Sequence, residues 1–484
     1  MAEIKDGARY DLVVIGGGAA GLVSSGFARA LGLSVALVSD GHPGGECLWT
    51  GCVPSKALIH QGQIAHTLRK YGSDDLKSRD LFGRAFEHML SARSKIAHHD
   101  SIETVEKSGV EVLLGKARFS DRNHIEIDGA KIYGNRFIVA TGGYQNIPDT
   151  LKEAGVLTHE TILELTEKPE SICIIGAGPV GVEYAQTLYR LGVRKVHLVE
   201  YTDRLLPREE PEISALVRKV LEEEGKQDIE LLTGFSATAA TQCGDKKKVV
   251  LESKDKKIEL EVDQILLATG KTAATRDMGL EAAGVKLNAR GFIEVDRHQR
   301  SSAPNIFAAG DVCGLYQFTH YADHTAQIAA LGAAFPLFIP FFKREERVVP
   351  WCTFFDPEIA SVGMRKEEAI ARYGQSNVFE LRYSLADFDR AIVDAQEWGT
   401  MIALVDKKGQ ILGATIAGAR AGEVIHEFAL AMQNKIAITA LARTIHVYPT
   451  MSAAVRNLSA QYYKVVTGNS ASLKLAKMLA ALMK

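Results

Sequence analysis

Cys47 and Cys52 stand five positions apart in the segment 44–56, which also carries Pro54 and Lys56. The thiolate is the reactive form of cysteine, and a helix N-terminus lowers the pKa of a thiol placed there. Proline suits the first turn of a helix, so the sequence predicts that a helix begins at Cys52. A buried pair or a structural disulfide is the alternative, but a glycine signature about thirty residues earlier favours a redox-active dithiol.

The composition narrows the class of protein. The chain has 484 residues, enough for about three domains. Its formal net charge is −2 and 24% of its residues are charged, which gives no electrostatic case for binding nucleic acid. Six cysteines do not make a disulfide framework in a chain of this length, and no signal peptide precedes the first apolar segment. We therefore expect a cytoplasmic protein.

Two apolar segments could meet a membrane or a partner. The run 333–342 is ten residues long and contains two prolines, so it is too short and too broken to span a bilayer. We expect another domain or subunit to cover it. In the C-terminal tail, 470–484, apolar residues recur at helical spacing, which predicts an amphipathic helix packed on the protein itself. A membrane surface or a partner protein is the alternative for this tail.

Two glycine signatures of the form Gly-x-Gly-x-x-Gly each follow an apolar strand and precede a helical pattern. Their glycines are Gly16, Gly18 and Gly21 in the first copy and Gly176, Gly178 and Gly181 in the second. Such glycines allow a tight turn and a close approach to a pyrophosphate at a helix N-terminus. One copy alone could be an ordinary strand–turn–helix corner. Two copies 160 residues apart predict two dinucleotide-binding domains.

An acidic residue about twenty positions after each signature usually binds the adenosine ribose. In the first copy the strand is followed by Ser39 and then Asp40, so both are candidates for contacting a dinucleotide, assigned as FAD because this copy is nearer the cysteines. In the second copy the strand ends at Glu200. A carboxylate there would repel a 2′-phosphate by about 4 kcal/mol at 4 Å and an effective dielectric near 20, which favours NADH over NADPH unless Arg204 offsets it. A solvated strand end is the alternative for Glu200.

A second repeat supports duplication of the two domains. A hairpin beginning at His124 leads to a strand that ends in Ala-Thr-Gly at Thr141 and Gly142. Another hairpin, within 249–262, leads to a second Ala-Thr-Gly that ends at Gly270. Farther along, an apolar strand ends at Gly310 and Asp311.

These segments together resemble those of the pyridine nucleotide–disulfide oxidoreductases, which include dihydrolipoyl dehydrogenase, glutathione reductase and mercuric reductase. The resemblance implies an α/β fold with two Rossmann-like dinucleotide-binding domains and an α+β dimerisation domain, and hence a homodimer. It divides the chain into a first FAD-binding segment (1–150), an NAD-binding domain (151–275), a second FAD-binding segment (276–345) and a dimerisation domain with a helical tail (346–484). The segment 353–363 resembles the opening strand of the dimerisation domain.

The resemblance also implies roles for the site residues. Cys52 would be the thiolate beside the flavin, and Cys47 the thiol that exchanges with substrate. Lys56 would pair with Glu183 near the flavin. The further residues implied at the cofactors, beside the glycine signatures, are Gly45, Thr141, Gly142, Gly270, Gly310 and Asp311.

Near the C-terminus the chain departs from the disulfide-reducing members, which have a histidine base with a glutamate five residues later. Tyr448 holds the base position, Ala453 holds the glutamate position, and His446 lies where the family often has a second histidine that is not the base. A phenol with a pKa near 10 is only about 0.1% ionised at pH 7, so it is a poor base but a usable donor. Mercuric reductases also have a tyrosine here, yet their additional C-terminal cysteine pair is not found after Cys352.

The sequence thus predicts an FAD-dependent oxidoreductase that passes electrons between NAD(H) and a substrate through Cys47 and Cys52. The substrate is either a small or protein-bound dithiol or disulfide, such as a lipoyl group, or a soft metal. A redox-sensing or scaffold flavoprotein with slow turnover is the alternative. No metal site is predicted for the isolated cysteines or for His98 and His99.

Overall fold

The computed structural model describes residues 4–72, 80–466, 468 and 478–483. The chain forms two compact units, each built from segments that are distant in sequence. The first unit comprises Met1–Glu170, Thr238–Val250 and Glu259–Arg344; the second comprises Ser171–Ala237, Leu251–Ile258 and Glu345–Lys484.

The first unit is built on a seven-stranded sheet in the order β3-β2-β1-β6-β5-β4, with β16 also paired to β6. The strands β1, β2, β3, β6 and β16 run parallel. The predicted hairpin that begins at His124 is formed by β5 and β6, and β4 pairs antiparallel with β5. Their bounds are β1 Arg9–Ile15, β2 Val35–Ser39, β3 Glu111–Leu114, β4 Arg118–Asp121, β5 His124–Ile127, β6 Ala130–Val139 and β16 Ile306–Ala308.

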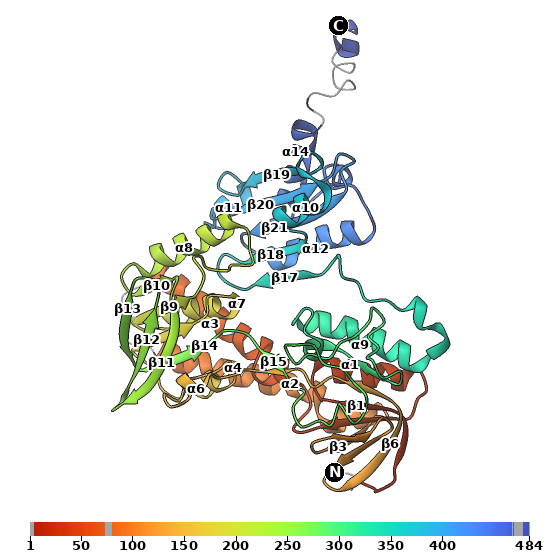
Figure 1. Ribbon diagram of the computed structural model, residues 1–484. Coiled ribbons are helices and arrows are strands. Elements are labelled where there is room, and N and C mark those ends of the chain that lie inside the picture. Colours follow the sequence, from red (N-terminus) through yellow and green to blue (C-terminus); the bar gives the residue numbers. More distant parts are fainter. Residues whose placement is uncertain (1–3, 73–79, 467, 469–477, 484) are drawn as a thin grey trace. The chain divides into compact units, whose positions relative to one another are not determined.

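Alternating residues of β1 face two different cores, as successive residues of a strand must. Leu12 and Val14 pack with α9 (Thr319–Ala334), whose buried alanines let it lie close to the sheet (Figure 1). Val13 and Ile15 belong to the core on the other face. Because both faces are covered, β1 is continuously apolar, which is typical of a parallel strand.

Among the remaining helices of the first unit, α2 and α3 carry the two cysteines, and α3 packs along α4. They are α1 Ala19–Ala30, α2 Gly45–Trp49, α3 Cys52–Tyr71, α4 Leu81–Ala97, η2 His98–Asp100, α5 Ile102–Lys107, α6 Asp149–Lys152, η3 Thr161–Glu164, η4 Gly310–Cys313 and η5 Pro336–Phe341.

The residues that follow the two Ala-Thr-Gly sequences pair with each other. β7 (Gly143–Tyr144) and β15 (Thr272–Ala273) form a short antiparallel ribbon. Thr141 reinforces it, because its hydroxyl donates to the carbonyl oxygen of Ala274 at 2.7 Å. The repeat found in the sequence therefore marks two crossing segments that meet in space.

The second unit contains a parallel sheet and an antiparallel sheet. β8, β9 and β10 pair parallel, with α7 following the second glycine signature. The antiparallel sheet has the order β17-β18-β21-β20-β19. The bounds are β8 Ser171–Ile175, α7 Pro179–Arg190, β9 Lys195–Glu200, α8 Pro211–Gly225, β10 Ile229–Thr233, β17 Pro350–Thr353, β18 Ile359–Gly363, α10 Lys366–Tyr373, η6 Gln375–Asn377, β19 Phe379–Ser384, α11 Asp389–Val393, β20 Thr400–Val405, β21 Ile411–Ala417, α12 Ala421–Gln433, α13 Ile438–Leu441 and α14 Ala453–Val465.

Four further strands occupy the chain between β10 and β15. They are β11 Ser236–Cys243, β12 Lys246–Glu252, β13 Lys257–Val262 and β14 Gln264–Leu267. β12 and β13 form the second predicted hairpin, with an ion pair of 2.6 Å between Lys248 and Glu259.

One predicted strand is wrong in its extent. The segment 353–363 was expected to be a single opening strand, but β17 ends at Thr353 and β18 begins at Ile359 as its antiparallel neighbour. Pro357 lies between them, and proline has no N–H to donate to a strand ladder. The chain therefore turns at this point.

The two apolar segments singled out in the sequence have different outcomes. The run 333–342 forms the end of α9 and η5, where Leu337 is 88% exposed and Ile339 is buried. That another domain or subunit covers this run stays a prediction. Most of the tail 470–484 lies outside the described residues, so its docking also stays a prediction. No helix in the described part of the chain has the length and hydropathy to cross a bilayer.

Candidate redox-active site

The cysteine segment forms two helices joined by a tight turn. Cys47 lies in α2 and Cys52 is the first residue of α3, which confirms the predicted helix start. The carbonyl oxygen of Glu46 accepts hydrogen bonds from the amides of Thr50 at 2.9 Å and Gly51 at 2.5 Å. These bonds close the chain between the two cysteines, so both thiols are held by one short loop.

The two thiols are chemically unequal. A hydrogen bond from Cys47 lowers the pKa of Cys52 to about 6, against the opposing effect of burial. Thr319 and the ammonium of Lys56 lower it further, with Sγ of Cys52 3.2 Å from Oγ1 of Thr319. The same bond to Cys52, together with burial, raises the pKa of Cys47. At neutral pH the loop therefore holds a Cys52 thiolate and a Cys47 thiol, which favours the roles implied by the resemblance.

The first glycine loop fits a dinucleotide, and the cysteine loop lies against it. Gly16 has φ +116°, and a Cβ added there would lie 2.3 Å from the carbonyl oxygen of Ala140. A Cβ on Gly45 would lie 2.5 Å from Cα of Gly18. Only glycine permits this approach, and it places the predicted FAD site directly beside the residues that lead into Cys47.

Ser39 and Asp40 differ in their orientation toward this loop. Ser39 is buried, and a Cβ added to Gly17 would lie 2.3 Å from its hydroxyl oxygen. Asp40 is exposed at the end of β2. The hydroxyl of Ser39 therefore faces the glycine loop.

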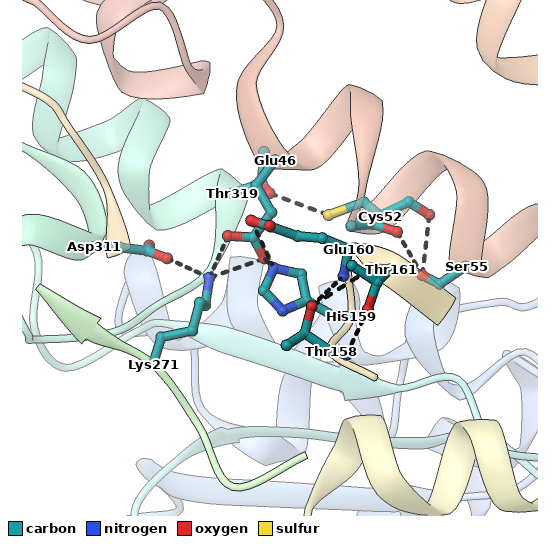
Figure 2. Close-up of polar contacts among 11 residues, drawn as sticks. Glu46, Cys52, Ser55, Thr158, His159, Glu160, Thr161, Lys271, Asp311 and Thr319 are labelled. Atoms are coloured by element: carbon teal, nitrogen blue, oxygen red, sulfur yellow. Dashed lines mark hydrogen bonds and ion pairs between the residues drawn. The ribbon is translucent and has the colours of Figure 1, made fainter. Parts of the chain in front are cut away.

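A partly buried ion cluster joins three of the sequence motifs. Nζ of Lys271 lies 2.7 Å from Oδ2 of Asp311 and 2.8 Å from Oε2 of Glu46, and Figure 2 shows it between the two carboxylates. Nε2 of His159 lies 3.4 Å from Oε1 of Glu46. Asp311 was predicted as a flavin contact, whereas Glu46, Lys271 and His159 were not predicted.

Two of the residues that were not predicted stand directly beside a sequence motif. Glu46 directly precedes Cys47, and Lys271 directly follows the second Ala-Thr-Gly at Gly270. Thr319 and His159 stand outside every motif, so only the fold brings them to the site.

The second glycine loop has the same form as the first. A Cβ on Gly181 would lie 1.9 Å from the carbonyl oxygen of Gly176. Glu200 is buried at the end of β9, and its carboxylate accepts hydrogen bonds from the amides of Ala177 at 2.8 Å and Thr202 at 3.0 Å. Glu200 is thus not a solvated strand end. Its carboxylate is aimed at the loop that would hold NAD(H).

Lys56 and Glu183 lie in different units. Lys56 is on the first turn of α3, near Cys52. Glu183 is buried on α7, where its Oε1 accepts a hydrogen bond from the amide of Phe354 at 2.7 Å. The pairing of these two residues stays a prediction.

The C-terminal segment places Tyr448 and His446 in separate pairs. Tyr448 is 72% exposed, and its hydroxyl donates to Oδ2 of Asp389 at 2.8 Å. That hydrogen bond and the charge of Asp389 raise the pKa of Tyr448, so the phenol keeps its proton. Nε2 of His446 lies 3.0 Å from Oε1 of Glu427, and the side chain of His446 is almost fully buried. Of these two side chains, Tyr448 is therefore the exposed one.

Two family profiles and several known proteins match most of the length of this chain. The profile described as "Pyridine nucleotide-disulphide oxidoreductase" matches residues 10–326, and that of the dimerisation domain of the same family matches 349–459. The mercuric reductase of Bacillus cereus is 32% identical over 452 residues, which cover 92% of this chain and 70% of that protein. The dihydrolipoyl dehydrogenase of Thermus scotoductus is 34% identical over 462 residues, which cover 92% and 95%.

A solved structure of a flavoprotein disulfide reductase is similar in fold to this chain. The Cu(II) complex of the HOCl-induced flavoprotein disulfide reductase RclA from Escherichia coli has a TM-score of 0.82 and 26% sequence identity, and the match covers 93% of this chain and 99% of that one. Two glycine loops and a loop with two cysteines lie within the range of the first profile, and the dimerisation profile follows them in the chain. This chain belongs to the pyridine nucleotide-disulphide oxidoreductase family, whose members are FAD-dependent flavoproteins.

Proposed function

We propose that this protein is an FAD-dependent enzyme that passes electrons between NAD(H) and an acceptor through Cys47 and Cys52. The observation that carries the proposal is the loop with one thiolate and one thiol, lying against the first glycine loop. When bound, FAD supplies a two-electron carrier between the nicotinamide and the disulfide. Reduction breaks the S–S bond with two electrons and one proton, leaving a Cys47 thiol and a Cys52 thiolate.

Residues around Cys52 would stabilise the reduced state. The hydroxyl of Thr319 and the charge of Lys56 both favour the thiolate, so little free energy is lost in holding a negative sulfur there. Cys47 retains its proton and is the sulfur that exchanges with an acceptor.

The acceptor that best fits the site is a soft metal ion or a similar electrophile bound by the two sulfurs. Tyr448 keeps its proton and donates to Asp389, so it cannot act as the base that takes a proton from an attacking dithiol. A metal ion needs no such base. The relatives include proteins named as mercuric reductases, and a Cu(II) complex of the structural neighbour has been solved. A lipoyl-type disulfide is the second candidate, favoured by the likeness to dihydrolipoyl dehydrogenases.

A substrate panel tests the proposal. Steady-state NADH oxidation is measured with Hg(II), Cu(II), lipoamide, a lipoylated protein and glutathione disulfide, and the reverse reaction is measured with dihydrolipoamide. Turnover with either metal supports the first candidate, and turnover only with lipoyl compounds supports the second. Reduction of the flavin by NADH without turnover on any acceptor would instead favour a redox sensor or scaffold flavoprotein.

We propose a homodimer as the active form, since a dimerisation domain matches residues 349–459. By resemblance to the family, that domain contributes to the active site of the partner subunit. The charge balance and cysteine content favour a cytoplasmic location.

We propose NADH as the coenzyme and expect Glu200 to set that choice. Glu200→Ala should narrow the preference for NADH over NADPH by about tenfold or more, because removal of the carboxylate relieves its repulsion of a 2′-phosphate. The measurement is kcat/KM for both coenzymes, with flavin content as the control. Because Glu200 also accepts two backbone hydrogen bonds, Glu200→Gln serves as a variant closer in shape. A wild-type enzyme that prefers NADPH would contradict the proposal.

A further inference from the structure

A single ammonium group in the first unit holds two carboxylates. Nζ of Lys271 lies 2.8 and 3.0 Å from the two carboxylate oxygens of Glu46 and 2.7 Å from Oδ2 of Asp311. The side chain of Lys271 is only 19% exposed. Burial would lower its pKa, but Asp311 and Glu46 outweigh that effect and raise it. The cluster therefore contains a fixed positive charge at every pH the protein meets.

The ion cluster joins the cysteine loop to two other motifs. Glu46 precedes Cys47, and its carbonyl oxygen closes the loop by accepting from the amides of Thr50 and Gly51. Lys271 stands between the second Ala-Thr-Gly and the crossing ribbon, and Asp311 lies in η4 after β16. Figure 2 shows the side chains from these segments converging on one point. The backbone of Glu46 thus closes the loop while its side chain is anchored 225 positions away in sequence.

We propose that Glu46 and Lys271 are positioning residues for the dithiol, with Lys271 anchoring the loop through Glu46 and balancing the negative charge that Glu46 brings to Cys52. This inference rests on the proposed function and adds the residues that tune its thiolate. Glu46 and Lys271 bond to each other, and Lys271 also bonds to Asp311, so both residues act on the sulfurs through the loop and through their charges.

The charges of Glu46 and Lys271 should shift the pKa of Cys52 in opposite directions. The carboxylate of Glu46 raises the pKa of Cys52, in opposition to Cys47, Thr319 and Lys56. The groups that face Glu46 are Lys271 and His159, and Lys271 in turn faces Asp311. The other charged group near the pair is Asp100, which acts on Cys47. A neutral residue at 46 therefore removes a charge that opposes the thiolate, whereas loss of Lys271 leaves two carboxylates without their cation.

The experiment measures the apparent pKa of Cys52 in the flavin-loaded homodimer. Each variant is reduced by two electrons, and the long-wavelength absorbance of a thiolate beside the flavin is followed as a function of pH. Glu46→Gln should lower the midpoint, and Lys271→Met should raise it, each by about half a unit to one unit. The double variant should return toward the wild-type midpoint, because the two charges are coupled. The pH dependence of alkylation of Cys52 by iodoacetamide gives a second readout that does not depend on turnover.

A matched control removes a different lysine–carboxylate pair from the same unit. Lys152→Met breaks an exposed pair with Asp149 and should leave the midpoint unchanged. His159→Gln separates the effect of the imidazole from that of Lys271. Flavin content and circular dichroism identify any variant that does not fold, in which case Lys271→Gln replaces Lys271→Met.

The outcomes distinguish this inference from the proposed function. Midpoints that move in opposite directions, with restoration in the double variant, support the positioning role. Unchanged midpoints in folded variants, or shifts in the same direction, would overturn it while leaving the redox function intact. Absence of the long-wavelength absorbance in the wild-type protein would overturn the proposed function itself.

Discussion

Cys52→Ser should abolish the long-wavelength absorbance of the two-electron-reduced protein, and Cys47→Ser should keep it. The reason is that Cys52 carries the lowered pKa and begins α3, whereas the pKa of Cys47 is raised. Both variants should lose at least about 10³-fold in turnover from NADH to the acceptor, because either substitution removes one sulfur of the dithiol. Reduction of the flavin by NADH should remain in both.

The absorbance should also depend on pH in the wild-type protein. The pKa of Cys52 is lowered to about 6, so the thiolate and its absorbance should be present at neutral pH and disappear as the pH falls through about 6. Cys243→Ser, at an exposed cysteine outside the loop, is the control and should behave as wild type. If both loop variants kept the absorbance, the assignment of roles to Cys47 and Cys52 would be wrong.

Tyr448→His combined with Ala453→Glu should raise turnover with lipoamide toward the roughly 10²-fold that a restored base contributes. The histidine would stand where the phenol now donates to Asp389, and the glutamate would stand on the first turn of α14, five positions later. Steady-state kinetics with lipoamide measure the gain. The single variant Tyr448→His is also informative, because it separates the contribution of the histidine from that of the glutamate.

The matched control for this prediction is Tyr448→Phe, which removes only the hydroxyl. It should reduce metal-dependent NADH oxidation more than it reduces flavin reduction by NADH. A double variant that is folded and dimeric but shows unchanged or lower activity with lipoamide would mean that proton transfer does not limit disulfide reduction in this protein.

The sequence alone determined the features that depend on local backbone geometry. The helix start at Cys52 follows from proline in the first turn, and the glycine loops follow from positions where a side chain would overlap the backbone, as at Gly16 and Gly45. The hairpins before each Ala-Thr-Gly follow from alternating strands joined by turns. The expectation of one strand across Pro357 was wrong, because proline has no N–H to donate to a strand ladder and the chain turns there into a second strand.

Only the tertiary structure decided which distant side chains meet at the site. Thr319 reaches Cys52 across 267 positions and Lys271 reaches Glu46 across 225, since these contacts depend on the pairing of β16 with β6 and of β7 with β15. Likewise, Asp389 holds Tyr448 because α11 lies beside the C-terminal segment in the fold. Residue type and spacing identified the chemistry of the dithiol. The charges that tune it come from long-range strand pairing, which no local pattern encodes.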